Sequence, residues 1–176
     1  DPDVHTLSIH QANMFPAGYG GLADRGEGAG TGANTNLPLP AGCGHEAYLH
    51  AMRRIGLPLI RDVRPDVIII ANGLDANHVD PLARMSCTSA TFAEMTAMVM
   101  QAADEVCDGR VVAMHEGGYS EAYVPFCGHR VVEGLAGIET GLCDPFLAKF
   151  MEQQPSPDHA AWQCAEIDRM ASALGF

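Results

Sequence analysis

Lysine is nearly missing from this chain of 176 residues, and positive charge as a whole is scarce. Lys149 is the single lysine, and the 10 basic residues are outnumbered by 22 acidic ones, which gives a net charge of −12. The sequence therefore has no basic cluster that could neutralise a nucleic-acid backbone or an anionic lipid surface. We expect this protein to bind neither nucleic acid nor membranes directly.

Long apolar runs and closely spaced cysteines are missing as well. The longest apolar run, residues 67–71, has the length of a strand, far below the roughly 20 residues that a membrane-spanning helix needs. The 6 cysteines form no Cys-x-x-Cys pair, so neither a zinc knuckle nor a thioredoxin-type redox site is indicated. We expect reduced thiols and a cytoplasmic protein, with a single disulfide as the alternative.

Three catalytic or binding motifs are also absent. No Gly-x-Ser-x-Gly occurs, so a serine hydrolase of that type lacks its nucleophile. His115-Glu116 opens a His-Glu-x-x-His pattern, but Tyr119 stands where the second histidine belongs, which excludes a zincin. The glycines of residues 16–44 match no phosphate-binding motif, and we interpret this Gly/Pro-rich stretch as one long functional loop.

What is present is an alternation of strands and helices. Strands are expected at 4–10, 67–71 and 110–114, where β-branched residues gather. Apolar spacing predicts a helix over 45–63, kinked at Pro58 and closed by Pro65, and further helices over 121–136 and 158–174. Thr91 and Glu94 form a capping-box pattern for another helix, which ends before Gly109. The pattern indicates an α/β fold with a parallel sheet.

In such sheets, ligands bind beyond the carboxyl ends of the strands, which directs attention to Asp75 and Tyr119. Asp75 is a candidate metal ligand or acid/base, although a turn aspartate bonding its own loop is the alternative. Tyr119 follows two glycines, and its phenol is a neutral donor suited to a developing oxyanion. A half-buried aromatic beside a turn is the alternative for Tyr119.

Several motifs in order resemble the family of zinc-dependent histone deacetylases, histone deacetylase-like amidohydrolases and acetylpolyamine amidohydrolases. They are Ser8-Ile9-His10, Phe15-Pro16, Asn36-Leu37-Pro38-Leu39-Pro40, Gly73-Leu74-Asp75-Ala76, Asp80-Pro81-Leu82 and Glu116-Gly117-Gly118-Tyr119. The stretches 80–85 and 116–128 look most similar to the bacterial class II-like amidohydrolases. The resemblance covers roughly residues 1–145 and implies the three-layer, parallel-sheet arginase/deacetylase-like fold.

The resemblance also implies roles for individual residues. Asp75 matches one of three zinc ligands, and Tyr119 matches the tyrosine that donates to the substrate carbonyl. Ser8 and Ile9 match part of a site for a monovalent cation, K⁺. The positions that match the acyl-lysine channel are Phe15, Leu82, Glu116, Gly117 and Gly118.

The chain lacks two motifs of that family, a tandem histidine pair and an Asp-x-His motif with two further zinc ligands. Asp3-Val4-His5 has the second form but lies only three residues before Ser8, whereas the family motif lies well upstream on the preceding strand, so a ligand pair here is the minor alternative. We therefore expect residues 1–176 to be the C-terminal portion of one deacetylase domain, with 16–44 as an active-site loop and 146–176 as a helical extension.

The function expected of the complete protein is zinc-dependent removal of acetyl groups from acetyl-lysine or acetylated polyamines. A single aspartate cannot hold catalytic zinc, so these residues alone are expected to be inactive. The alternative is a non-catalytic half-fold that serves as a binding or assembly module, and its exposed sheet edge would favour a homo-oligomer.

Overall fold

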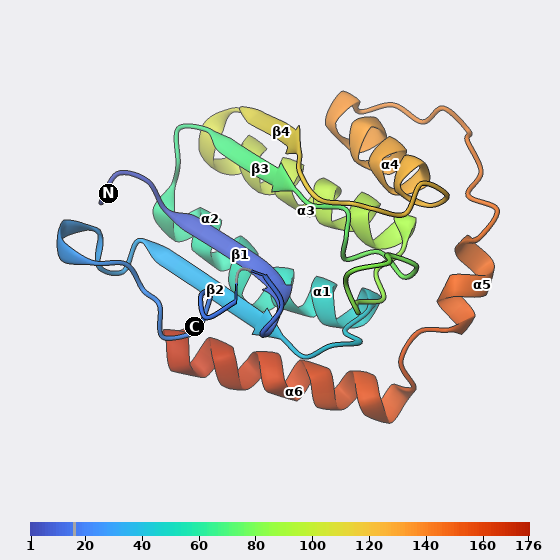
Figure 1. Cartoon of the computed structure of the whole chain (residues 1–176). Coiled ribbons are helices and arrows are strands. Elements are labelled where there is room, and N and C mark those ends of the chain that lie inside the picture. The colour runs from blue at the N-terminus through green and yellow to red at the C-terminus, as the bar shows by residue number, and fades with distance from the viewer. Residues whose placement is uncertain (16) are drawn as a thin grey trace.

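A computed structural model describes residues 1–15 and 17–176, and Figure 1 shows the arrangement of its elements. The sequence alternates between strands and helices as expected. In order along the chain, the regular elements of the described residues are β1 (Thr6–Gln11), β2 (Asn34–Leu39), α1 (His45–Ala51), α2 (Leu57–Val63), β3 (Ile68–Asn72), α3 (Ser89–Cys107), β4 (Val111–His115), α4 (Val124–Ala136), α5 (Leu147–Glu152) and α6 (Pro157–Leu174). A short 3₁₀ turn, Gly28–Gly30, precedes β2.

The strands of the described residues form two parallel pairs, β1 with β2 and β3 with β4. Ser8 is opposite Asn36 in the first pair, and Ile70 is opposite Ala113 in the second. Helix α3 provides the crossover from β3 to β4, as parallel strands require. The predicted α/β fold with parallel strands is therefore confirmed, and the loops after β1, β3 and β4 leave from carboxyl ends of strands.

Strand β2 corrects the prediction of a single loop over 16–44. Leu37 and Leu39 are fully buried, and β2 pairs with β1 along its whole length. The prolines and asparagines of this stretch are typical of loops, but Pro38 is tolerated because β2 has β1 on one side only and no other described strand pairs with it. Pro16, which begins the predicted loop, lies outside the described residues.

The helix predicted over 45–63 is present, but its irregularity lies before Pro58. A π-helical turn, Met52–Gly56, separates α1 from α2, and the Leu57 N–H donates to the Met52 carbonyl five residues back. Pro58 has no N–H to donate to the Arg54 carbonyl, so a wider turn just before it is favourable. The helix ends at Arg64 in the left-handed conformation, directly before Pro65, as predicted.

The N-terminus of α3 lies earlier than the predicted capping box. Thr88 is the N-cap, and its backbone N–H donates to Thr91 Oγ1 at 3.0 Å. Thr91 is therefore the third helical residue rather than the cap, and Glu94 instead lies 3.6 Å from the His45 ring. Helix α4 starts at Val124, three residues after the predicted start at 121.

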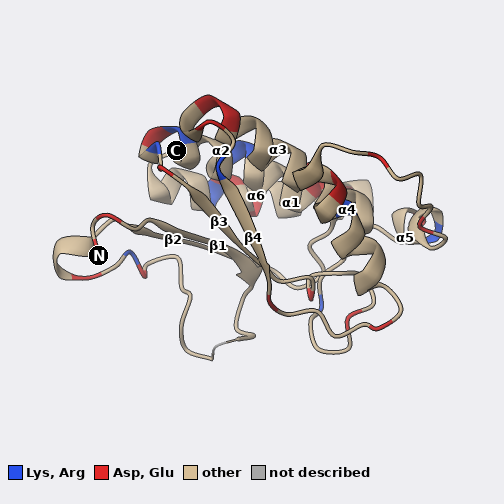
Figure 2. Ribbon diagram, turned by 90° about the horizontal axis from the view of Figure 1, so that it is seen from above, with Lys and Arg blue, Asp and Glu red and all other residues tan. Residues whose placement is uncertain are grey.

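Four of the helices lie together on one side of the strands (Figure 2). Figure 2 shows α1, α2, α3 and α6 on this side, and the buried core lies between these helices and the strands. The opposite face of the β3–β4 pair is open, because Ile69 is 65% exposed and the apolar side chains of Val112 and Met114 are exposed too. Within the described residues, the second helical layer of a three-layer fold is not present.

The last part of the chain is attached to the core by polar side chains. Gln154 accepts a hydrogen bond from the His45 N–H and donates one to the Ser86 carbonyl, and Gln163 donates to the Gly42 carbonyl. These contacts join α5 and α6 to the start of α1. No helix in the described part of the chain is both long and apolar enough to cross a membrane.

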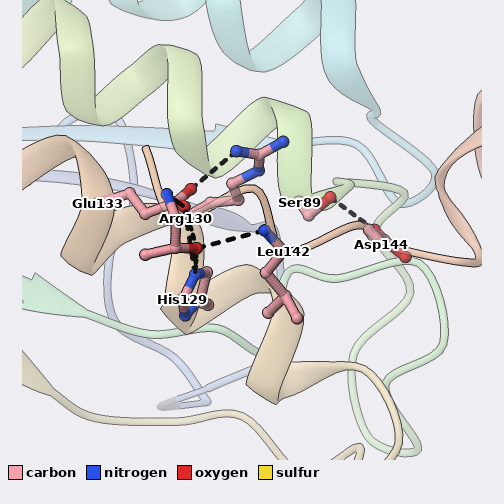
Figure 3. Close-up of polar contacts among 7 residues, drawn as sticks. Ser89, His129, Arg130, Glu133, Leu142 and Asp144 are labelled. Atoms are coloured by element: carbon pink, nitrogen blue, oxygen red, sulfur yellow. Dashed lines mark hydrogen bonds and ion pairs between the residues drawn. The ribbon is translucent and has the colours of Figure 1, made fainter. Parts of the chain in front are cut away.

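The segment between α4 and α5 is held by two carboxylates (Figure 3). Glu133 is buried and accepts hydrogen bonds from Arg130 and from both the backbone and the hydroxyl of Thr140. Asp144 accepts hydrogen bonds from the hydroxyls of Ser89 and Tyr123. Residues 138–146 are thus attached to α4 and to the start of α3.

Candidate active site

The loops that follow β3 and β4 are packed backbone against backbone. Beyond the strands, the Leu74 N–H donates to the Gly117 carbonyl at 2.7 Å. A side chain on Gly117 would overlap Asp75 Oδ2, and one on Gly118 would meet Leu74 Cβ at 3.0 Å. Gly118 also has a φ of 136°, which disfavours any residue with a side chain. The two glycines therefore allow Asp75 to lie beside the segment that leads to Tyr119.

The environment of Asp75 disfavours its charge in the absence of a cation. Partial burial raises the pKa of the Asp75 carboxyl above its ordinary value, and the negative charge of Asp80 adds to this rise. Hydrogen bonds from the backbone N–H groups of Asp75 and Ala76 oppose it. None of the ion pairs among the described residues includes Asp75. A partly desolvated carboxylate of this kind would be stabilised in its charged form by a bound cation.

Asp80 connects the two loops, and the sequence analysis assigned it no role. Its Oδ2 accepts a hydrogen bond from the Tyr119 N–H at 2.9 Å, and its Oδ1 accepts from the N–H groups of Leu82 and Ala83 at 2.9 and 3.1 Å. The side chain is buried. The Asp-Pro pair predicts a local turn, but no sequence signal indicates the contact with Tyr119, 39 residues away.

Tyr119 lies at the surface next to a hollow. Its side chain is 52% exposed, which leaves the phenol accessible. A hollow of about 400 Å³ lies beside it, between Gly118, Ser120 and the first turn of α4. Tyr119 is thus accessible beside a hollow, and its role as a hydrogen-bond donor to a ligand stays a prediction.

The residues predicted to line a substrate channel differ in their surroundings. Phe15 is 85% exposed and Leu82 is 56% exposed, whereas Gly117 and Gly118 are partly buried between the two loops. Glu116 is exposed, and its N–H donates to the Asn72 carbonyl. The Asp80 carboxylate links the backbones of Leu82 and Tyr119. Gly117 and Gly118, which precede Tyr119, lie against Leu74. Phe15 belongs to the separate loop after β1, and its place in a channel stays a prediction.

Ser8 and Ile9 are neighbours on β1. The Ser8 hydroxyl lies 2.8 Å from His10 Nδ1, and His10 Nε2 donates to the Gly20 carbonyl at 3.0 Å. In the neutral ring, an Nε2 that donates leaves Nδ1 to accept from the Ser8 hydroxyl, and the lone pairs of the Ser8 oxygen then stay open to a cation. One hydroxyl and one carbonyl are too few oxygens for a complete site, so the K⁺ assignment stays a prediction.

The described residues do not complete a zinc site around Asp75. Among the described residues, no group of three or more His, Cys, Asp or Glu side chains is placed to hold a metal ion. His5 of the Asp3-Val4-His5 motif instead lies 3.1 Å from Thr35 Oγ1. Asp75 fits a single zinc ligand, and a catalytic zinc needs about three protein ligands. The donors in this chain therefore form only part of such a site.

Comparison with known proteins identifies the class to which this fold and site belong. Residues 1–135 match the model of the histone deacetylase domain. The chain belongs to the histone deacetylase family, as the motifs around Asp75 and Tyr119 led us to expect.

Individual relatives support the same assignment. The chain is 49% identical over 175 residues to the histone deacetylase-like amidohydrolase of Pseudomonas aeruginosa, which covers 99% of this chain and 46% of that protein. It is 34% identical to the acetoin utilization protein AcuC of Bacillus subtilis, over 92% of this chain and 43% of that protein. Histone deacetylase 14 of Arabidopsis thaliana, a chloroplastic protein, is 41% identical over 68% of this chain and 28% of its own length. The chain thus spans less than half the length of these curated relatives.

Solved structures confirm the fold. The structure of the histone deacetylase Clr3 matches 99% of this chain and 28% of its own, with a TM-score of 0.78 and 28% identity. The crystal structure of the HDA15 HD domain matches 98% of this chain and 49% of its own, with a TM-score of 0.70 and 25% identity. The predicted arginase/deacetylase-like fold class is therefore correct.

Proposed function

We propose that this chain is the C-terminal part of a zinc-dependent amidohydrolase that removes acetyl groups from acetyl-lysine or from acetylated polyamines. The observation that carries the proposal is the position of Asp75 against Gly117, next to an exposed Tyr119, at the carboxyl ends of two parallel strands. This arrangement occurs in a chain that belongs to the histone deacetylase family. The remaining zinc ligands and the general base would come from residues outside this chain.

In this proposal, each residue of the chain has a defined task. Bound zinc would polarise the acetyl carbonyl and lower the pKa of a water molecule. Asp75 would supply one anionic oxygen ligand, and the cation would lower the raised pKa of this carboxyl and keep it ionised. The Tyr119 hydroxyl would donate a hydrogen bond to the carbonyl oxygen as negative charge develops on it. Leu82 and Phe15 would offer apolar surface to the acyl-lysine side chain.

The same reasoning predicts that residues 1–176 alone neither bind zinc tightly nor hydrolyse amides. We also propose a cytoplasmic location, which the free thiols of all six cysteines in the described chain support. The strongly acidic composition supports substrates other than nucleic acid, and it would attract basic acetylated proteins or polyamines.

The test is hydrolysis by the full-length protein that contains this chain. Purified protein is assayed with a fluorogenic acetyl-lysine amide and, in parallel, with acetylated spermidine or putrescine. We expect turnover of at least one substrate, inhibition by a chelator and recovery on addition of zinc. A full-length, folded and zinc-supplied protein that hydrolyses neither class of substrate would contradict the proposal.

A second candidate, a non-catalytic assembly module, has one specific observation in its favour. The open face of the β3–β4 pair carries exposed Ile69, Val112 and Met114, a surface suited to another layer of protein. The intact mass of the native protein separates the candidates. A mass of 18.7 kDa supports the module, whereas roughly twice that mass supports the enzyme, since the chain matches 46% of the Pseudomonas relative.

A further inference from the structure

We infer that Asp80 is a positioning residue that sets the placement of Tyr119 and Leu82 relative to each other, an inference that rests on the proposed function. Tyr119 follows β4, whereas Leu82 lies in the loop between β3 and α3. Asp80 is the side chain that accepts hydrogen bonds from the backbones of both residues. The Asp80 carboxylate thus links the backbone of Tyr119, the proposed oxyanion donor, to the backbone of Leu82, a residue of the proposed substrate channel.

The two oxygens of Asp80 have separate partners. Oδ1 accepts from Leu82 N and Ala83 N, at 2.9 and 3.1 Å, within the same turn. Oδ2 accepts from Tyr119 N at 2.9 Å across to the other loop. Asn77, which is fully buried and donates to the Leu74 carbonyl at 2.7 Å, places its Nδ2 3.5 Å from the same Oδ2. The aspartate therefore meets N–H donors from both loops.

A carboxylate is the side chain that suits this position. All the hydrogen-bond partners of the Asp80 carboxylate among the described residues are N–H donors, and an ionised carboxylate has acceptor sites on both oxygens and no donor. The side chain is only 8% exposed, and none of the ion pairs among the described residues includes Asp80. Backbone N–H groups of both loops therefore hold the carboxylate, and with it the two loops, in one arrangement.

A purely local turn does not explain the contact with Tyr119. An aspartate that accepts hydrogen bonds two and three residues ahead is common in turns, and Oδ1 does this. The bond from Oδ2 to Tyr119 N joins residues 39 positions apart and adds nothing to the turn. Its effect is to fix the backbone of the residue whose hydroxyl would stabilise the oxyanion.

The test is a pair of substitutions in the full-length protein. Asp80→Ser retains one oxygen for the local turn but cannot also reach Tyr119 N, and Asp80→Asn keeps the size but turns an N–H₂ group toward one set of donors. We expect both variants to lower kcat about 10²-fold, because a shift of about 1 Å at a reacting group has that effect. Displacement of Leu82 is expected to raise KM as well.

A double-mutant cycle with Tyr119→Phe separates positioning from stability. When the hydroxyl of Tyr119 is already absent, Asp80→Ser should leave kcat almost unchanged, while its effect on KM persists. A merely structural role would instead reduce kcat by the same factor, within about twofold, in both backgrounds, and that result would overturn the inference. Failure of both Asp80 variants to fold, judged by Tm, would also overturn it, because the contacts would then serve the fold alone.

Asp144→Asn provides the matched control. Asp144 likewise accepts three hydrogen bonds, from Ser89, Tyr123 and the Phe146 N–H, but in the segment that leads to α5. This variant should lower Tm without changing kcat or KM.

The wild-type assay distinguishes failure of the proposed function from failure of the Asp80 inference. No turnover by the wild-type protein contradicts the proposed function, whereas normal turnover by both Asp80 variants contradicts only the role of Asp80.

Discussion

Asp75 Oδ2 lies so close to Gly117 that a methyl group on this glycine would overlap it. Asp75 follows β3 and Gly117 follows β4, so the contact joins the ends of two neighbouring parallel strands. This close approach places the carboxylate beside the segment that carries Tyr119.

Gly117→Ala should displace the Asp75 carboxylate. The added methyl group meets Oδ2 itself, and the backbone of Gly117 is fixed by its hydrogen bond with Leu74. We expect the full-length variant to lose zinc affinity and turnover together while remaining folded. Zinc content and kcat are measured alongside Gly56→Ala, whose methyl group meets chiefly the flexible Met52 side chain. Normal zinc content in Gly117→Ala would show that the contact does not matter for the metal.

Tyr119→Phe should remove the proposed oxyanion donor and little else. The side chain is half exposed, so loss of one hydroxyl should leave Tm nearly unchanged. Removal of one such donor commonly lowers kcat by about 10²–10³-fold. Steady-state kinetics of the full-length variant with an acetyl-lysine amide provide the measurement. A kcat equal to that of the wild type would reject the assignment of Tyr119.

Glu133→Gln should make the free energy of unfolding less sensitive to pH in the acid range. Hydrogen bonds from the Thr140 hydroxyl and backbone, followed by Arg130, lower the pKa of Glu133 from 4.5 to about 2. A carboxylate with a depressed pKa in the folded state stabilises the protein above its unfolded pKa, and this contribution is lost as pH falls through the folded value.

The difference in unfolding free energy between the wild type and Glu133→Gln should therefore be constant above pH 4.5 and shrink as pH falls toward about 2. Denaturant unfolding of the full-length protein at a series of pH values measures this difference. Glu152→Gln, which removes one negative charge at an exposed position, serves as the control. A difference that does not change with pH would contradict the role given to the Glu133 network.

The 176-residue polypeptide by itself should self-associate through the open face of the β3–β4 pair. Ile69 and Val112 are opposite each other on this face and both are exposed. Light scattering after size exclusion should show oligomers, and the double substitution Ile69→Thr with Val112→Thr should reduce their mass. Trp162→Gln on α6, which removes an exposed aromatic side chain elsewhere, should not. A monomeric wild-type chain would argue against this surface.

The positions of Asp75 and Tyr119 could be predicted from the sequence because two general rules apply to them. A continuous β-branched run identifies β3, and the rule for parallel sheets then directs attention to the residues just after β3 and β4. The family motifs added their roles. The contact between Asp75 and Gly117 depends on the register of β3 and β4, which the sequence alone does not specify.

Other features were missed because longer-range packing decides them. Strand β2 contains Pro38 and follows many glycines, so its composition favours a loop, yet burial of Leu37 against the core makes it a strand. Both Thr88 and Thr91 are good capping residues, and the structure selects the earlier one. The contact of Asp80 with Tyr119 joins distant residues and has no local signature.

Zinc stoichiometry tests the central claim most directly. In the proposed enzyme, this chain supplies one zinc ligand, Asp75, to a site completed by residues outside it. Full-length protein, purified without chelator, should contain about one zinc per chain, as a site with about three protein ligands predicts. The Asp75→Ala variant and the isolated 176-residue chain should contain almost none. One zinc per chain in the isolated polypeptide, or full zinc content in Asp75→Ala, would contradict the account.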